Sequence, residues 1–141
     1  MKFSFIRNLL VVLGLNLCFI SISFGQQSDS TLKYAVVIKF QSICCGVPNA
    51  SPLKKFVSKF KKEYHTKTIR ADKIGPMGRE GEYYLGFKLK ELTRKQKYYF
   101  LKKVTVVTSK LTDKGKAIAE ENVIIDKSTL PQIATITKVY Y

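Results

Sequence analysis

Apolar residues alternate with polar ones in several short stretches of the chain, and they recur every three or four positions in two longer stretches. Alternation is typical of strands with one buried face, whereas the longer repeat is typical of amphipathic helices. The predicted strands are residues 34–41, 66–73, 82–90, 122–126 and 133–141. The predicted helices are residues 52–64 and 93–107.

Both predicted helices have recognisable start signals. Ser51 is a favourable N-cap with Pro52 at the first helical position, and Thr93 with Gln96 forms a capping box. The apolar stripes are Leu53, Phe56, Val57, Phe60 and Tyr64 in the first helix and Phe100, Leu101, Val104 and Val107 in the second. The β-branched run 104–108 would also suit a strand, but the stripe favours a helix.

The segments between these elements are rich in turn-forming residues. Residues 42–51 and the glycine-rich stretch 74–81 are predicted loops, the second at the tip of a hairpin with Arg79 and Glu80 exposed. Residues 113–121 are polar and predicted to be a loop, with a helical turn at 116–121 as the alternative.

This order of elements predicts one α+β domain over residues 34–141. Two strand–helix–strand units with a hairpin between them are typical of the ferredoxin-like βαββαβ sandwich. In that arrangement both helices cover one face of an antiparallel sheet. The last predicted strand is then an additional C-terminal strand at the edge of the sheet.

The first 25 residues have the pattern of a secretory signal peptide. Lys2 and Arg7 precede an apolar run over residues 9–24, and small residues close the segment at Gly25. Cleavage near Gly25 would export the protein to the periplasm or the extracellular space and leave no stable membrane span. Residues 26–33 would then form a disordered leader.

Two other interpretations of this segment are less well supported. A retained membrane anchor requires about 20 apolar residues, and the uninterrupted apolar run is shorter. Lipid attachment at Cys18 requires a small residue before the cysteine, but Leu17 stands there.

The chain is strongly basic, with a formal net charge of +15 over 141 residues. Without the signal peptide, 23 bases remain against 10 acids. Such a domain is attracted to anionic polymers or phospholipid headgroups, although surface lysines often serve solubility alone. Because most of the bases are lysine, shaped recognition of nucleic acid is not expected. The sequence does not specify the partner, and an anionic envelope polymer and another protein are the two candidates.

Cys44 and Cys45 are the thiols that remain after cleavage, and they are adjacent in the predicted loop 42–51. Adjacent Cα atoms lie about 3.8 Å apart, closer than the ~4.4–6.8 Å usual across a disulfide. A bridge between the two would be strained. They are predicted either to bind a soft metal ion, to bridge another chain or to act as a redox-labile pair, or simply to pack under the loop.

The position of this cysteine pair resembles that in heavy-metal-associated domains. Those ferredoxin-like domains hold Cu(I) or a similar soft ion on two cysteines between the first strand and the first helix. The resemblance implies a metal site at Cys44 and Cys45. In that family two residues separate the cysteines, whereas here they are adjacent.

No catalytic constellation is found in the sequence. His65 is the only histidine. It follows the predicted first helix, whereas the cysteines precede that helix, so about 20 Å of helix separates them. The leading hypothesis is a non-catalytic exported binding domain without a cofactor, and the alternative is a soft-metal or thiol-redox protein. The lysines of the first helix are expected to be a solvated face or a weak anion site.

Overall fold

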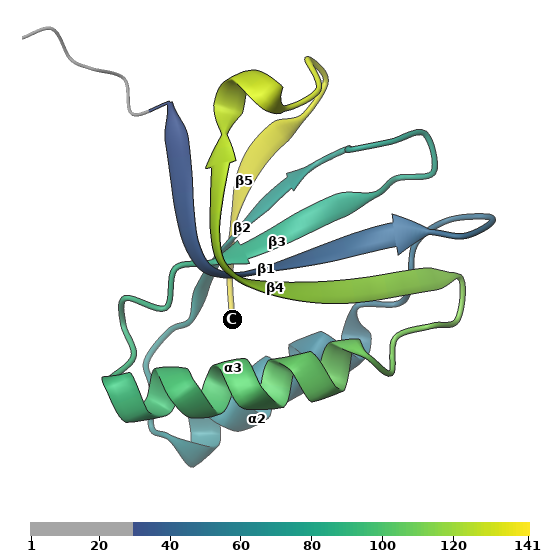
Figure 1. The fold of residues 1–141 in the computed structure, drawn as a ribbon. Coiled ribbons are helices and arrows are strands. Elements are labelled where there is room, and N and C mark those ends of the chain that lie inside the picture. Colours follow the sequence, from purple (N-terminus) through teal and green to yellow (C-terminus); the bar gives the residue numbers. More distant parts are fainter. Residues whose placement is uncertain (1–29) are drawn as a thin grey trace, which may run out of the picture.

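The computed structural model describes residues 30–141, which form a twisted sheet with two helices beneath it (Figure 1). In chain order the elements are β1 (Thr31–Ser42), α2 (Ser51–Glu63), β2 (Arg70–Gly75), β3 (Tyr83–Phe87), α3 (Arg94–Thr108), β4 (Gly115–Asp126), the short 3-10 helix η1 (Lys127–Thr129) and β5 (Thr135–Tyr140). The predicted signal peptide, residues 1–25, lies outside the described residues.

The sheet has five strands in the order β4-β1-β3-β2-β5, and every neighbouring pair is antiparallel. This confirms the α+β class. The predicted hairpin is present as β2 and β3. The additional C-terminal strand is β5, which pairs with β2 at the edge of the sheet as expected.

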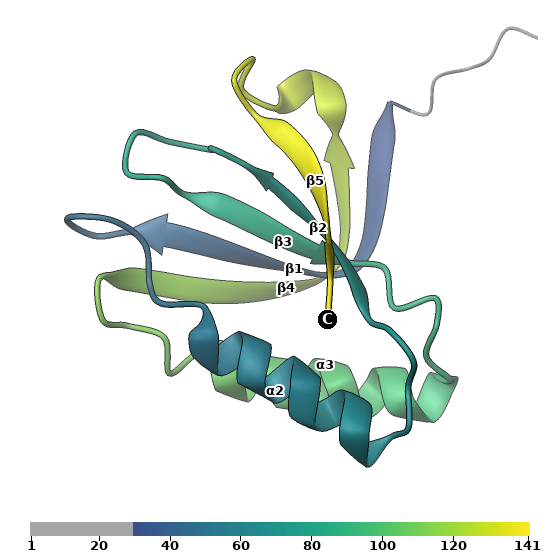
Figure 2. The ribbon, with the colours of Figure 1, turned by 180° about the vertical axis from the view of Figure 1, so that it is seen from behind.

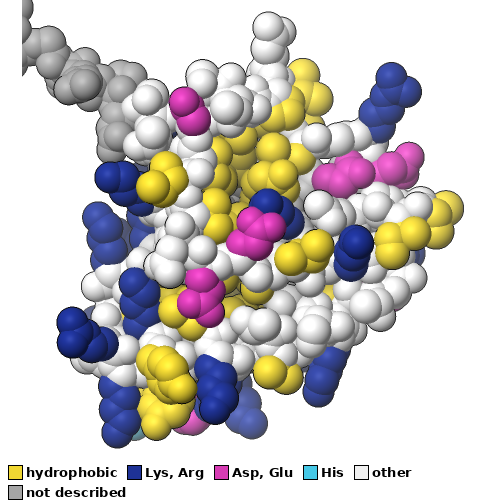
Figure 3. Space-filling view, viewed as in Figure 1, with side chains coloured by type: hydrophobic (Ala, Val, Ile, Leu, Met, Phe, Trp, Pro, Cys, Tyr) yellow, Lys and Arg dark blue, Asp and Glu magenta, His cyan; other side chains and the backbone are white. Residues whose placement is uncertain are grey.

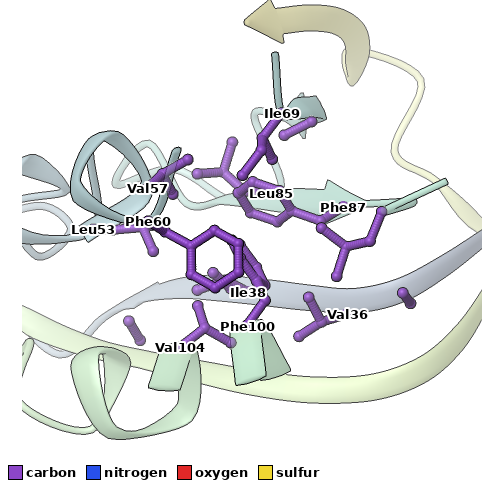
Figure 4. Packing of buried hydrophobic residues seen from close by; sticks show 14 of the residues in the cluster. Val36, Ile38, Leu53, Val57, Phe60, Ile69, Leu85, Phe87, Phe100 and Val104 are labelled. Atoms are coloured by element: carbon purple, nitrogen blue, oxygen red, sulfur yellow. The ribbon is translucent and has the colours of Figure 1, made fainter. Parts of the chain in front are cut away.

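The main core lies between the sheet and the two helices, which run side by side under one face (Figures 1 and 2). Its centre is aromatic. The ring of Phe100 meets that of Phe60 edge-on at 5.2 Å and lies 5.5 Å from that of Phe87 on the sheet (Figure 4). Burial of each such side chain stabilises the fold by about 1.5–3 kcal/mol. The aromatic contact therefore ties both helices to the same part of the sheet.

Helix α3 begins and ends as the sequence predicts. The Thr93 hydroxyl accepts from the Gln96 amide at 3.3 Å, and the Gln96 side chain accepts from the Thr93 amide at 2.9 Å. The β-branched run 104–108 is helical, because Val104 and Thr108 both face the core. The Thr108 hydroxyl donates to the Val104 carbonyl at 3.0 Å, which satisfies the one buried polar side chain of this helix.

The start of α2 differs from the prediction. Ala50, and not Ser51, is the N-cap residue, and it makes no side-chain capping bond. The side chain of Asn49 instead accepts from the Ser51 amide at 2.9 Å. Because Asn49 already satisfies this amide, Ser51 can enter the first helical turn together with Pro52.

The predicted loop at residues 113–121 is wrong for most of its length, as is the helical turn at 116–121. Strand β4 starts at Gly115 and pairs with β1 along the whole of β1. Ala117 and Ala119 lie on the helix-facing side, where their small side chains contact the core. Lys39 and Glu120 form an ion pair of 2.7 Å between the two strands. Pairing with β1 therefore overrides the weak strand preference of this sequence.

Strand β1 begins at Thr31, three residues before the predicted start of the domain at residue 34. Residues 31–33 pair with the end of β4, so this part of the predicted leader is ordered. Near Tyr34 both strands bend, and Asn122 of β4 has a φ of +54° there. The bend brings Tyr34 onto the open face of the sheet, opposite the helices. A second, smaller core forms there around Tyr34, Val37 and Ile74.

The hairpin strands also have shifted limits. Strand β2 covers residues 70–75, although residues 66–73 were predicted. Strand β3 ends at Phe87, because Leu89 adopts a φ of +52° and turns the chain toward α3. The loop at its other end exposes Arg79 and Glu80 as expected.

We expect Phe100→Ala to reduce the free energy of unfolding by about 3–5 kcal/mol, because it removes a fully buried ring from the centre of the core. The matched control is Tyr98→Ala on the same helix, where the side chain is 61% exposed. This control should change stability by less than about 0.5 kcal/mol. Chemical denaturation measures both values, and equal losses would contradict the packing described.

Candidate functional site

Cys44 and Cys45 lie in the loop between β1 and α2, and both are exposed free thiols. The Ile43 and Cys44 amides donate to the Lys114 carbonyl at 3.2 and 3.5 Å, which fixes the base of the loop. At the tip, Cys45 has a φ of +57° and Gly46 one of +109°. The cysteines are therefore not packed under the loop but accessible from solvent.

Within residues 30–141, no group of three or more His, Cys, Asp or Glu side chains is placed to hold a metal ion. Cys44 and Cys45 would have to bind a soft metal as two adjacent ligands or together with ligands from another molecule. The predicted metal site stays a prediction.

His65 follows the end of α2, is exposed and has a φ of +51°. The cysteine loop precedes the other end of the same helix. The structure therefore places His65 away from Cys44 and Cys45, as the sequence indicates.

The two helices together form a strongly basic layer, which we call the helix layer. They contain ten bases and one acid, Glu63. The bases are Lys54, Lys55, Lys59, Lys61 and Lys62 on α2, and Arg94, Lys95, Lys97, Lys102 and Lys103 on α3. Figure 3 shows many Lys and Arg side chains around the lower part of the molecule, where the helices lie.

Within residues 30–141, almost none of this positive charge is neutralised by an ion pair. Among the ten bases, Lys103 alone has an ion-pair partner in the described part of the chain, Glu63 at 3.1 Å. The Lys103 ammonium also donates a hydrogen bond to Glu63 in this ion pair. That bond is the main reason that the pKa of Lys103 is raised. Four lysines of α2 line a shallow depression with Ser58. The helix layer thus presents nine bases without an ion-pair partner among the described residues.

A groove of about 860 Å³ lies at one end of the helix layer. It is lined by the chain that leads from α2 into β2, by the ends of β3 and β5, and by the start of α3. In Figure 2 the chain rises from the end of α2 into β2, with β5 nearby. We call this cavity the basic groove.

Five bases line the basic groove: Lys67, Arg70, Lys88, Lys90 and Lys138. Its two carboxylates are Asp72 and Glu91. Lys88 lies 3.5 Å from Asp72, and the other four bases form no ion pair within the described part of the chain. Glu91 accepts from the Arg70 amide at 2.8 Å. The groove therefore combines an excess of positive charge with two hydrogen-bond acceptors.

Tyr34 supports the floor of the groove. Its ring covers Gly86, where an added Cβ would lie 2.6 Å from the ring carbons. The Tyr34 hydroxyl donates to Asp72 at 2.9 Å, and the Lys88 ammonium lies 5.6 Å from the ring centre. Burial is the main reason that the pKa of Tyr34 is well above its usual value, and the bond to Asp72 raises it further. Tyr34 thus fixes the position of Asp72 in the groove.

Sequence reasoning missed the basic groove because its residues come from separate elements. Arg70 lies opposite Tyr140, and Asp72 lies opposite Lys138, only because β2 pairs with β5. One signal in the sequence could have indicated part of the groove. Lys138 and Tyr140 are two residues apart in the last predicted strand, so their side chains share one face of it.

Comparisons with known proteins give no guide to the function of these surfaces. No family model matches the sequence, and no match is found among curated proteins or solved structures. Within residues 30–141, no helix is both long and apolar enough to cross a membrane.

We expect stability to decrease as the pH rises from about 10 to 12, because buried tyrosines must lose their protons. Burial is the main reason that the pKa of Tyr83 is raised to about 12, with the nearby Tyr141 adding to it. The pKa of Tyr34 is raised as well. A raised pKa favours the protonated folded state, so this stability is complete below pH ~10 and is lost above it.

Absorbance titration of tyrosinate provides the measurement. Tyr34→Phe and Tyr83→Phe should each remove a component that ionises late in the wild-type protein. Tyr98→Phe, at an exposed position, is the control and should leave both of these late components in place. If all eight tyrosines of the wild type ionise together near pH 10, the burial argument is wrong.

Proposed function

We propose that this protein is a non-catalytic, exported binding domain that holds an anionic polymer on its helix layer. The observation that carries the proposal is the concentration of ten bases and one acid on two neighbouring helices. Export is inferred from the predicted signal peptide at residues 1–25. An anionic polymer of the cell envelope is therefore the partner that we expect.

The composition of the helix layer favours binding by charge over shape-specific recognition. Nine of its ten bases are lysine, a compact point charge on a flexible stem, and one is Arg94. Flexible ammonium groups can follow an irregular polymer, and each contact releases counterions from it. Such binding is strong at low salt and tolerant of the exact sequence of the polymer.

We also infer that residues 34–126 have the ferredoxin-like arrangement, with β5 added at one edge. Two observations support this inference. The elements follow the order β1, α2, β2, β3, α3, β4, and β3 lies between β1 and β2 in the sheet. Both helices also lie on the same face (Figure 1).

We expect retention on immobilised dextran sulfate to fall steeply with salt and to depend on the helix layer. The test variant replaces Lys54, Lys55, Lys59 and Lys62 with glutamine. The control variant replaces four exposed bases outside the helices with glutamine: Lys33, Lys110, Lys114 and Lys116. The test and control variants therefore have the same net charge. The slope of log K against log salt is negative for the wild-type protein. Its magnitude should become smaller by roughly 3 in the test variant and by less than about 1 in the control.

Two results would contradict the proposal. One is retention of the wild-type protein that does not depend on salt. The other is an equal loss in the two variants, because the net charge alone would then account for binding and the helix layer would have no special role.

The alternative function is soft-metal binding or thiol-redox chemistry at Cys44 and Cys45. One observation favours it: both thiols are exposed and free. The Ile43 and Cys44 amides bond the Lys114 carbonyl, which holds the base of the loop while its tip stays open to solvent.

We expect Cys44→Ser with Cys45→Ser to leave retention on dextran sulfate unchanged, because neither thiol belongs to the helix layer. Metal analysis and thiol titration of the same variant test the alternative. If the wild-type protein binds a stoichiometric soft metal ion that the variant loses, the alternative is supported. If metal content and redox behaviour are the same in both proteins, it is excluded.

A further inference from the structure

The basic groove has the size and the mixed chemistry of a site for a small ligand or for one unit of a polymer. Its volume of about 860 Å³ lies within the range of roughly 300–1,000 Å³ that is usual for such sites. The lysines of α2 line only a shallow depression with Ser58, whereas the larger groove combines lysine with Arg70, tyrosines and two carboxylates. The two surfaces therefore suit different modes of binding.

The positive charge of the groove requires an anionic group on the ligand. Arg70 on β2 and Lys138 on β5 lie on neighbouring strands, and Lys67 and Lys90 lie in the chain segments next to them. None of these four side chains has an ion pair within residues 30–141. Arg70 offers a planar fork that matches a carboxylate or a sulfate.

The two carboxylates in the groove indicate that the ligand also donates hydrogen bonds. Tyr34 and Lys88 both contact Oδ2 of Asp72, and the Arg70 amide donates to Oε1 of Glu91. Among residues 30–141, no hydrogen bond reaches Oδ1 of Asp72 or Oε2 of Glu91, so these oxygens can accept from a ligand. Hydroxyl groups can donate to these oxygens, whereas a polyphosphate has no donor there and would be repelled.

The tyrosines of the groove provide a flat surface for a ring. Tyr140 is 60% exposed and lies directly across from Arg70 in the sheet. Tyr64 is held in place by stacking on Phe60, with the ring centres 4.3 Å apart. An exposed aromatic ring beside a guanidinium group suits a sugar ring that carries an acidic group, because the ring packs on tyrosine while the acid meets arginine.

We propose that the basic groove binds an acidic sugar unit, with a uronate as the simplest example. Arg70 and Lys138 contact its carboxylate, Asp72 and Glu91 accept from its hydroxyls, and Tyr140 packs against its ring. This inference rests on the proposed function and specifies it: the anionic polymer is an acidic polysaccharide. Lys67 follows α2 and Lys90 precedes α3, so the groove adjoins the helix layer in the chain.

Calorimetric titration with trigalacturonate tests the proposal, because this ligand combines carboxylates, hydroxyls and rings in a short chain. Maltotriose has the rings and hydroxyls without the charge, and tripolyphosphate has the charge without the rings. The wild-type protein should bind trigalacturonate at low salt at least about tenfold more tightly than either of the other two, since each lacks one set of contacts.

The groove variants are Tyr140→Ala and Arg70→Gln with Lys138→Gln. Each should weaken trigalacturonate binding by about tenfold and leave retention on dextran sulfate nearly unchanged. The matched control is the helix variant at Lys54, Lys55, Lys59 and Lys62. This variant should lose retention on dextran sulfate and bind trigalacturonate nearly as well as the wild-type protein does. Thermal unfolding shows whether each variant is folded, and Tyr140→Phe should retain binding because it keeps the ring.

The possible results separate this inference from the proposed function. If trigalacturonate does not bind while dextran sulfate does, the groove proposal is wrong and the helix layer remains. If tripolyphosphate binds as tightly as trigalacturonate, the groove is a general anion site and the sugar assignment is wrong. If neither trigalacturonate nor dextran sulfate binds, both proposals fail.

Discussion

The contact between the aromatic rings of the two helices and the sheet is the interaction on which the rest of the structure depends. Phe60 on α2 and Phe100 on α3 meet edge-on at 5.2 Å, and Phe87 of the sheet lies 5.5 Å from Phe100. The helices that this contact joins have nine basic side chains with no ion-pair partner within residues 30–141. Two unit charges 4 Å apart in water repel by about 1 kcal/mol, and salt weakens this further. Burial of the apolar stripes outweighs that repulsion.

This balance explains why the charged surface lies where it does. Each helix has a narrow apolar stripe that packs on the sheet, so the remaining positions must face solvent. Ten of the 28 residues in the two helices are Lys or Arg, and only one is acidic. A high charge density on one side of the domain is therefore a direct result of packing two basic amphipathic helices on the same face.

The parts of the fold that depend on local sequence could be predicted. The stripe and the capping box at Thr93 and Gln96 define α3 without reference to any other element, and the structure confirms both. Strand β4 could not be predicted in full, because Ala117 and Ala119 have little preference for a strand. Their conformation is set by pairing with β1, which is remote in the sequence.

The candidate site was predictable only where charge accumulates within one element. The lysines of α2 were visible as a group, and they were interpreted as a solvated face or a weak anion site. The basic groove was not visible, because Arg70 and Tyr140 are 70 positions apart and meet through pairing of β2 with β5. Sites made by strand pairing need the order of the strands, which local patterns do not specify.

The groove and the core are also linked physically, which bears on how the two proposed surfaces would act together. Tyr64 lines the groove, and its ring stacks on Phe60 at 4.3 Å. Gln96, whose other contact is the Thr93 cap, donates to the Tyr64 carbonyl at 3.2 Å. One wall of the groove is thus held by both helices. Charge on the helix layer acts over about 10 Å, so it would collect a polymer first. The groove, held rigid by the same aromatic core, would then bind an individual sugar unit at short range.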